Sequence, residues 1–259
     1  MELSLSKPWD LFWSDEFSGS TLDTGSWTAE VMPDPHNEEL QYYTDRINQE
    51  ENANIWQEDG HLIIEGRAEN YRHRHYTSGR LISFQKREFL YGRFEARMKL
   101  PNEIGTWPAF WLLGNSIETK GWPACGEIDI MEGKGRLPNW VSSAIHFGPD
   151  YQHRKFFSKA FQSVKDNFQN EWHIFSVEWV PNQIQWFVDG QVYHTVKKEE
   201  VTERDPAYWP FDHGHPYYII FNLALGGWFD KPNYPPENML PQRLYVDYVR
   251  VYTSTRTDQ

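Results

Sequence analysis

The sequence predicts an all-β protein of the sandwich or barrel class, and three observations support this prediction. Short segments that alternate apolar and polar residues lie between glycines and prolines, with turn signals at the spacing typical of sandwiches. Aromatic residues, which favour sheets, make up 17% of the 259 residues. No segment carries a long, capped helical pattern, and the best short helix candidate lies within residues 159–168.

Two strand patterns stand out in the first half of the chain. The turn pair Asp59-Gly60 precedes the mostly apolar segment 61–65, which indicates a strand entered through a tight turn. Across residues 91–100, alternate positions from Phe94 to Met98 are apolar and the positions between them are charged. That alternation predicts a strand with one buried and one exposed face.

The second half of the chain continues the same pattern. Residues 172–179 and 184–188 alternate, and the turn pair at 189–190 joins the second of these segments to a further strand. The run 217–225 is almost continuously apolar, as expected of a central strand that is buried on both faces. Residues 244–252 supply a closing strand.

Length and charge limit the classes of protein. A chain of 259 residues is at the upper end for one sandwich or barrel, so residues 1–259 are predicted to form a single domain. The 37 acidic residues outnumber the 25 basic ones, for a net charge of −12. Such a surface repels phosphate backbones and disfavours nucleic acid as a partner. The lone cysteine, Cys125, excludes an internal disulfide.

The chain carries no membrane or export signal of its own. No stretch approaches the roughly 18 apolar residues that a membrane helix needs, so no membrane partner is expected. The N-terminus also lacks the basic region and apolar segment of a signal peptide. The protein is therefore predicted to be either cytoplasmic or exported with its signal peptide already removed.

Tryptophan is unusually frequent, with 13 residues. Sugar rings and nucleobases both stack on exposed aromatic side chains, and the negative charge favours sugar. A large core built from residues that favour strands explains the same composition equally well.

The chemistry is concentrated in one acidic strand, residues 126–133. Side chains alternate between the two faces of a strand, so Glu127 and Asp129 share one face while Ile128 and Ile130 point into the core. Two carboxylates on a buried strand are costly unless they have a function.

Glu132 lies five positions after Glu127, so a regular strand would turn it towards the core. One extra residue, a β-bulge near Met131, would return it to the acidic face. The two glutamates are then expected roughly two residue steps of about 3.3 Å apart, near the ~5–5.5 Å of a retaining glycosidase. Asp129 would lie between them and help to set unequal pKa values. Spacing does not assign the nucleophile.

Two other interpretations fit the acidic strand. It could be a charged edge strand, although that leaves the isoleucines unexplained. It could also hold Mg²⁺ or Ca²⁺ between its carboxylates, but no glycine-rich phosphate-binding sequence lies nearby. With tryptophans on both sides, a glycosidase is favoured.

Longer motifs around this strand are similar to one family. Residues 107–113 (WPAFWLL) and 121–132 (GWPACGEIDIME) resemble the laminarinases of glycoside hydrolase family 16. The resemblance implies a β-jelly-roll sandwich of two antiparallel sheets with a substrate cleft on the concave sheet, formed as one catalytic domain. Further matching segments follow in the family's order: 15–19, 41–44, 76–80, His146, 172–188, 222–227 and 247–252.

The resemblance also implies roles for the acidic residues. By it, Glu127 is the nucleophile, Asp129 its assistant and Glu132 the acid/base. The presence of Met131 resembles the bulged form of the motif, which agrees with the bulge inferred from the alternation of side chains along the strand.

Substrate-binding positions carry over from the resemblance one at a time. Trp107 and Trp111 resemble tryptophans that line the minus subsites, and Trp122 resembles a cleft-wall aromatic. Core packing is the alternative for each, more so for Trp111. Arg80 could instead be an ion-pair partner, and His146 a packed strand histidine. The remaining residues implied to contact substrate are Asn37, Arg80, His146, Asn222 and Gln242.

Family members often hold a structural Ca²⁺ away from the catalytic centre, and the matching positions here are Glu16, Gly60 and Asp247, mostly through backbone oxygens. An empty site is the alternative, and no cofactor is expected for catalysis. Residues 150–170 have no clear match and are expected to form a loop at the cleft edge. The histidine pairs at 73/75 and 213/215 are interpreted as loop residues because further ligands are missing.

The function implied is retaining endo-hydrolysis of β-1,3-glucan, with mixed-linkage β-1,3/1,4-glucan as a further substrate. A non-catalytic glucan-recognition module is one alternative, and an enzyme of another β-glycan, such as a red-algal galactan, is the other. The expected partner is a β-glucan polysaccharide or oligosaccharide, bound by a monomer. A polymer too large to enter a cell implies an extracellular enzyme.

Overall fold

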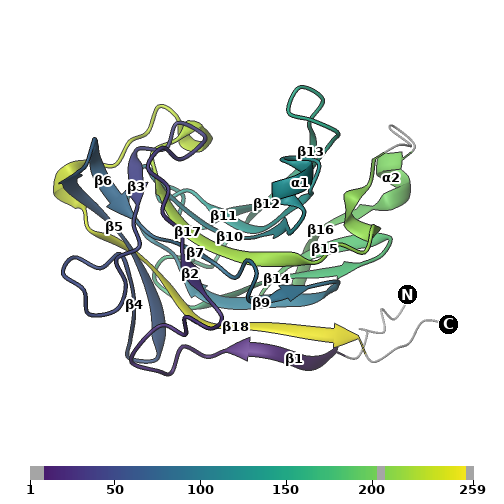
Figure 1. The fold of residues 1–259 in the computed structure, drawn as a ribbon, viewed down its shortest axis with the longest axis horizontal. Coiled ribbons are helices and arrows are strands. Elements are labelled where there is room, and N and C mark those ends of the chain that lie inside the picture. The colour runs from purple at the N-terminus through teal and green to yellow at the C-terminus, as the bar shows by residue number, and fades with distance from the viewer. Residues whose placement is uncertain (1–8, 203–207, 255–259) are drawn as a thin grey trace.

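The computed structural model describes residues 9–202 and 208–254, and these form two sheets packed face to face (Figure 1). One sheet has ten strands and is called the convex sheet; the other has eight and is called the concave sheet. The concave sheet curves so that its free face is hollowed and turned away from its partner (Figure 1). This arrangement confirms the predicted jelly-roll sandwich of two largely antiparallel sheets.

The convex sheet has the strand order β16-β15-β14-β9-β18-β5-β6-β3, with β1 on β18 and β4 on β5. Its pairs are antiparallel except for β3 and β6, which are parallel. The strands are β1 (Trp9–Asp15), β3 (Gln41–Tyr43), β4 (Ile55–Glu58), β5 (His61–Tyr71), β6 (Arg74–Ser78), β9 (Gly92–Lys99), β14 (His173–Val180), β15 (Gln183–Val188), β16 (Gln191–Lys197) and β18 (Gln242–Ser254).

The concave sheet has the order β13-β12-β11-β10-β17-β7-β2, with β8 on β17. The acidic strand β11 therefore lies inside this sheet, flanked by β12 on one side and β10 on the other. The strands are β2 (Thr28–Ala29), β7 (Arg80–Ile82), β8 (Glu88–Phe89), β10 (Thr106–Gly114), β11 (Glu127–Gly133), β12 (Trp140–Phe147), β13 (Lys155–Gln162) and β17 (Tyr217–Leu225).

Helices are short in the described part of the chain. They are α1 (Ile117–Lys120), α2 (Lys198–Thr202) and the 3₁₀ turns η1 (Pro210–Asp212), η2 (Trp228–Asp230) and η3 (Glu237–Met239). Among the described residues, none of these helices has the length and apolar character needed to cross a membrane. The helix expected within residues 159–168 is wrong: Lys155–Gln162 forms β13, whose eight residues all pair with β12.

Alternation along the strands builds the core between the sheets, as predicted. Phe94, Ala96 and Met98 of β9 are fully buried, while the charged residues between them are partly exposed. All nine residues of β17 are buried, because this strand lies between β10 and β7 and is covered on both faces. Large aromatic side chains fill much of the interior, and Trp27, Trp179 and Trp186 are fully buried.

The two predicted hairpin turns are also confirmed. Asp59 and Gly60 have φ angles of 52° and 77° and connect β4 to β5. Asp189 and Gly190 have φ angles of 48° and 78° and connect β15 to β16. Two consecutive left-handed residues match the right-handed twist of the strands that they join, which explains the Asp-Gly pairs.

Candidate active site

A β-bulge in β11 brings the third carboxylate to the concave face. Opposite β12, Asp129 pairs with Ala144 and Glu132 pairs with Ser142, so three steps on β11 correspond to two on β12. Opposite β10, Trp111 pairs with Asp129 and Phe110 with Met131. The extra residue is thus Ile130, next to the predicted position. Ile128, Ile130 and Met131 all belong to the buried core, which leaves the carboxylates on the other face.

The separation predicted for the glutamates was too small. Glu127 pairs with Leu113 and Glu132 with Ala109, so four residue steps separate them along the regular strand β10. At about 3.3 Å per residue this puts their main chains ~13 Å apart. A carboxyl–carboxyl distance shorter than this requires both glutamate side chains to extend towards each other.

Each of the two glutamates accepts a hydrogen bond from an indole. Trp122 Nε1 donates to Glu127 Oε2 at 3.0 Å, and Trp107 Nε1 donates to Glu132 Oε1 at 3.0 Å. A hydrogen bond to a carboxylate stabilises its charged form and fixes its orientation. The two tryptophans thus hold the glutamates as well as shaping the site.

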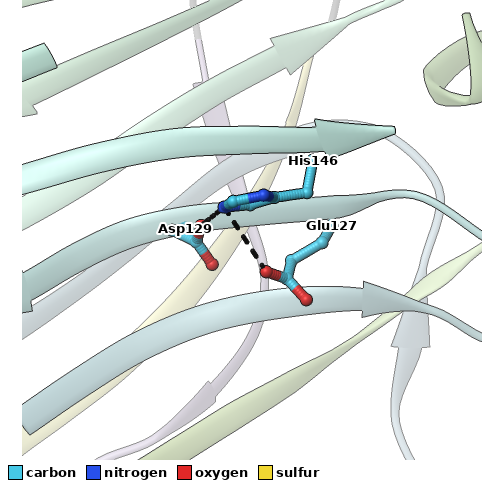
Figure 2. A group of neighbouring side chains, drawn as sticks. All are labelled: Glu127, Asp129 and His146. Carbon is cyan, nitrogen blue, oxygen red and sulfur yellow. Dashed lines mark ion pairs between the residues drawn. The ribbon is translucent and has the colours of Figure 1, made fainter. Parts of the chain in front are cut away.

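His146 lies on β12 directly opposite Glu127 and forms ion pairs with Glu127 and Asp129 (Figure 2). Its Nε2 atom is 3.2 Å from Asp129 Oδ2 and 3.8 Å from Glu127 Oε1. Figure 2 shows the ring above the gap between the two carboxylates. The ligand atoms of Glu127, Asp129 and His146 lie within 4.8 Å of one another, close enough to hold a cation, although the histidine itself supplies positive charge here.

The electrostatics of this cluster are mutually dependent. Burial raises the pKa of both Glu127 and Glu132, and the charge of Asp129 raises both further. Burial lowers the pKa of His146, but the hydrogen bond to Asp129 and the surrounding carboxylates outweigh it and bring that pKa to about 9. At neutral pH His146 is therefore a cation within an acidic site.

The glutamates differ in their remaining neighbours. Arg80 lowers the pKa of Glu127, whereas the charge of Glu127 raises the pKa of Glu132. Burial and the charge of Asp129 nonetheless raise the pKa of both glutamates to about 8, so these neighbours do not make one of them the stronger acid.

We expect His146→Gln to move the pH–rate profile upwards. Without the nearby cation, both glutamates hold their protons more tightly, so the acidic limb of kcat/KM should move up by about one pH unit or more. His75→Gln, on the convex strand β6, provides a control with an unchanged profile. A profile of the His146 variant that stays in place, or moves down, would show that His146 does not stabilise the carboxylates.

A hydrogen-bonded chain of polar groups lies on the β10 side of the acids. Trp111 Nε1 donates to Asn222 Oδ1 at 2.7 Å, and Asn222 Nδ2 donates to the Tyr43 hydroxyl at 3.1 Å. Tyr43 in turn donates to Glu39 at 2.9 Å, and burial raises the pKa of Glu39. The Arg80 guanidinium lies 4.8 Å from the centre of the Trp111 ring. Arg80 also pairs with Glu30, as the ion-pair interpretation predicts, and its contact with substrate stays a prediction.

Trp107 is more enclosed than the sequence suggested. It is only 7% exposed and stacks on Phe229 at 4.6 Å, so little of its surface is left for a sugar. Trp228, with 54% of its surface exposed, contacts it edge-on at 6.0 Å. The Trp228 main-chain N–H donates to the carbonyl of Asn37 at 2.8 Å, which places Asn37 at this end of the site.

The remaining predicted residues lie elsewhere. Gln242 opens β18 in the convex sheet, where its amide bonds the main chains of Asn102 and Met239. Glu16 directly follows β1, and the last residue of β1 pairs with Val249. Gly60 directly precedes β5, and the second residue of β5 pairs with Val246. Both residues are therefore near Asp247. The Glu16 carboxylate binds Arg250 at 2.8 Å, and that of Asp247 binds Arg97 at 2.7 Å. The carboxylates of Glu16 and Asp247 are thus already paired with arginines.

Sequence reasoning missed several contributors to the site. Tyr43 lies in the segment 41–44, which matches the family but was given no role, and Glu39 lies two residues before that segment. Trp186, on β15 of the convex sheet, donates its indole N–H to the carbonyl of Asp129 at 2.8 Å, immediately before the bulge. Tyr43 and Trp186 bond partners 179 and 57 positions away in the sequence, so no local pattern marks these contacts.

The loop before β11 is tightly built. Gly126 has φ +81°, and a Cβ there would lie 1.9 Å from the Tyr217 hydroxyl, so only glycine fits before Glu127. Its neighbour Cys125 is a free, buried thiol.

Comparisons with known proteins agree with this geometry. The sequence model of Glycosyl hydrolases family 16 matches residues 39–250. A beta-glucanase of Rhodothermus marinus is 42% identical over 253 residues, which cover 94% of this chain and 85% of the relative. The catalytic domain of an endo-1,3-beta-glucanase (laminarinase) from Thermotoga petrophila has a TM-score of 0.85 and 39% identity, covering 97% of this chain and 100% of that chain. LamA from Z. galactanivorans, in complex with laminaritriose and laminaritetraose, has a TM-score of 0.80 and 32% identity, covering 94% of this chain and 98% of that chain.

Proposed function

The chain belongs to glycosyl hydrolases family 16, and from this membership we propose that it hydrolyses internal β-1,3 bonds of laminarin-type glucan with retention of configuration. Mixed-linkage β-1,3/1,4-glucan is proposed as a second substrate. The observation that carries the proposal is the bulge at Ile130, which presents Glu127, Asp129 and Glu132 together on the concave face beside His146.

Glu127 and Glu132 have different roles in the proposed reaction. Glu127 attacks the anomeric carbon as the glycosidic bond breaks, and Glu132 donates its proton to the departing oxygen. Water then attacks the anomeric carbon of the glycosyl-enzyme while Glu132 takes a proton from that water, and the bond to Glu127 breaks to release the carboxylate. The two carboxyls complete this chemistry without a metal or cofactor.

The surrounding residues orient substrate and acids. Asp129 bonds His146 and so keeps a positive charge beside the nucleophile. Trp111, with Arg80 and Asn222 around it, is proposed to hold the sugars of the minus side, and Trp122 the wall next to Glu127. Asn37 and Trp228 extend this surface beyond Trp107.

The alternatives have less support. A glucan-recognition module needs no catalytic acids, yet all three are present, with hydrogen-bond partners that orient them. An enzyme of sulfated galactans would need a basic site, whereas this chain has a net charge of −12.

A substrate comparison tests the proposal. We expect the purified protein to release reducing sugar fastest from laminarin, as a ladder of short oligomers, and more slowly from mixed-linkage β-glucan. Agarose and carboxymethyl cellulose serve as negative controls. Laminarin that binds but is not cut would support the recognition module instead, and fastest cleavage of agarose would support a galactanase.

We further propose that residues 1–259 act as one catalytic domain, as a monomer outside the cell, where the polymer is found. Light scattering should then give a mass near 30.8 kDa. A dimer mass would contradict the monomer, and activity confined to the cell interior of the source organism would contradict the location.

A structural Ca²⁺ is proposed at the main-chain oxygens of Glu16, Gly60 and Asp247, because the nearby carboxylates are already neutralised by arginines. The ion would stabilise the native state by mass action. We expect the melting temperature to rise on adding millimolar Ca²⁺ to chelator-treated protein, with activity at low temperature unchanged. An identical melting temperature with Ca²⁺ and with chelator would eliminate this site.

A further inference from the structure

The hairpin loop between β12 and β13 carries two exposed aromatic side chains beside the acids. Tyr151 and Phe156 are each 62% exposed. The loop projects above the concave sheet (Figure 1). Residues 150–170 were expected to form a loop at the cleft edge, but Lys155–Gln162 within them form the edge strand β13.

The position of Phe156 follows from the pairing of β13 with β12. Phe156 is directly opposite His146, so both side chains lie on the concave face, and their rings stack at 5.7 Å with an angle of 26°. The next residue, Phe157, points to the other face and stacks on the buried Phe147. Because side chains alternate along a strand, Phe157 packs in the interior and Phe156 lies on the same face as the acids.

Tyr151 joins the site through Trp122. Their ring centres are 5.7 Å apart, and Trp122 lies 6.0 Å from His146. The Arg154 guanidinium lies 4.3 Å from the centre of the Tyr151 ring. The loop itself is braced by Asp150, whose Oδ1 accepts the main-chain N–H groups of Gln152 and His153 at 2.9 and 3.0 Å. The aromatic surface is thus continuous from Glu127 to Phe156 and is held by hydrogen bonds.

The location of this surface indicates which part of a substrate it meets. In the sheet order, β13 and β12 lie on one side of β11, while β10, β17 and β7, which carry Trp111, Asn222 and Arg80, lie on the other. A polysaccharide cut in its interior must extend to both sides of the acids. With the minus-side sugars over Trp111, the leaving part of the chain runs over β12 and β13.

We propose that Tyr151 and Phe156 form a sugar-binding subsite for the leaving-group part of a β-glucan chain. This inference rests on the proposed function. Flat aromatic faces suit the apolar C–H faces of glucose rings, and the exposed surface would be covered when substrate binds. Its role is affinity for long chains and selection of the bond to be cut, separate from the chemistry of the acids.

Two substrates separate this subsite from the catalytic machinery. Laminarihexaose extends over both sides of the acids, whereas β-laminaribiosyl fluoride has only a fluoride ion as its leaving group. For Tyr151→Ala, Phe156→Ala and the double variant, we expect kcat/KM on the hexaose to fall by up to about tenfold, with a shift in which bond is cut. On the fluoride the same variants should stay within about twofold of the unmodified enzyme, since no sugar reaches the loop.

Phe12→Ala is the matched control, because Phe12 is 65% exposed on β1 of the convex sheet. It should leave both substrates unaffected. An equal fall on the hexaose and the fluoride would mean that the loop only supports the fold near His146, and unchanged rates on both would remove the subsite; either result overturns the inference. If the unmodified enzyme cuts neither substrate, the proposed function itself fails.

Discussion

Glu127→Gln should abolish laminarin hydrolysis while laminarin still binds. Glutamine has nearly the same shape and can keep a contact with Trp122, but it cannot form the glycosyl-enzyme bond. We expect turnover to become undetectable and binding of laminarin, measured by calorimetry or affinity electrophoresis, to stay within a fewfold of the unmodified enzyme. Near-normal turnover would remove Glu127 as the nucleophile.

Glu132→Gln should behave differently, because an acid helps least when the leaving group is already good. Loss of general acid catalysis should lower kcat on laminarin by about 10²–10⁴-fold and affect a glycosyl fluoride much less. Added azide distinguishes the two roles. In the Glu132 variant azide should capture the glycosyl-enzyme as the β-glycosyl azide; in the Glu127 variant any azide product should have the α configuration. The opposite pattern would exchange the two assignments.

Trp186→Phe should lower both stability and activity. The Trp186 indole crosses the sandwich to donate to the Asp129 carbonyl, next to the bulge that turns Glu132 to the concave face. Phenylalanine keeps most of the packing but leaves a buried carbonyl without this donor, which should cost about 1–3 kcal/mol in the free energy of unfolding. Relaxation of the bulge should displace Glu132, and a displacement of about 1 Å can lower kcat ~10²-fold.

Trp179→Phe is the matched control for this effect. Trp179 is equally buried in the same sheet and also donates to a main-chain carbonyl, that of Phe211, at 2.8 Å. Its variant should lose a similar amount of stability with kcat changed only a fewfold. If both variants lose activity equally, the effect is general loosening of the core, and the bulge does not depend on Trp186.

Much of the fold could be predicted because one physical signal, the alternation of buried and exposed residues, decides it. Strands β9, β14 and β15 follow that signal closely, and β17 follows the continuous apolar run of a strand buried on both faces. The failure at residues 159–168 has a clear cause. Phe161, Val164 and Phe168 are spaced by three and four positions, which suits one face of a helix. Pairing with β12, which local sequence cannot reveal, decides in favour of the strand.

The site was predictable where the chemistry requires side chains on the same face of one strand. It was unpredictable where packing brings distant segments of the chain into contact. The bulge followed from the need to bring Glu132 to the face of Glu127. The separation of the two glutamates was wrong because the steps along the strand were undercounted. Contacts such as Asn222 with Tyr43, 179 positions apart, depend on the order of strands in the sheet. The same is true of Trp186 with Asp129, which belong to different sheets.

The buried thiol of Cys125 can report when the loop before Glu127 opens. Burial, with the charge of Glu127, raises the pKa of this thiol to about 12, so the closed protein has almost no reactive thiolate near neutral pH. A thiol-specific dye can then react only when the loop that leads into Glu127 opens. The rate of labelling measures how often that opening occurs, on a time scale that spectroscopic melting does not reach. A bound oligosaccharide that closes over the loop should slow the labelling in proportion to its occupancy, without any engineered probe.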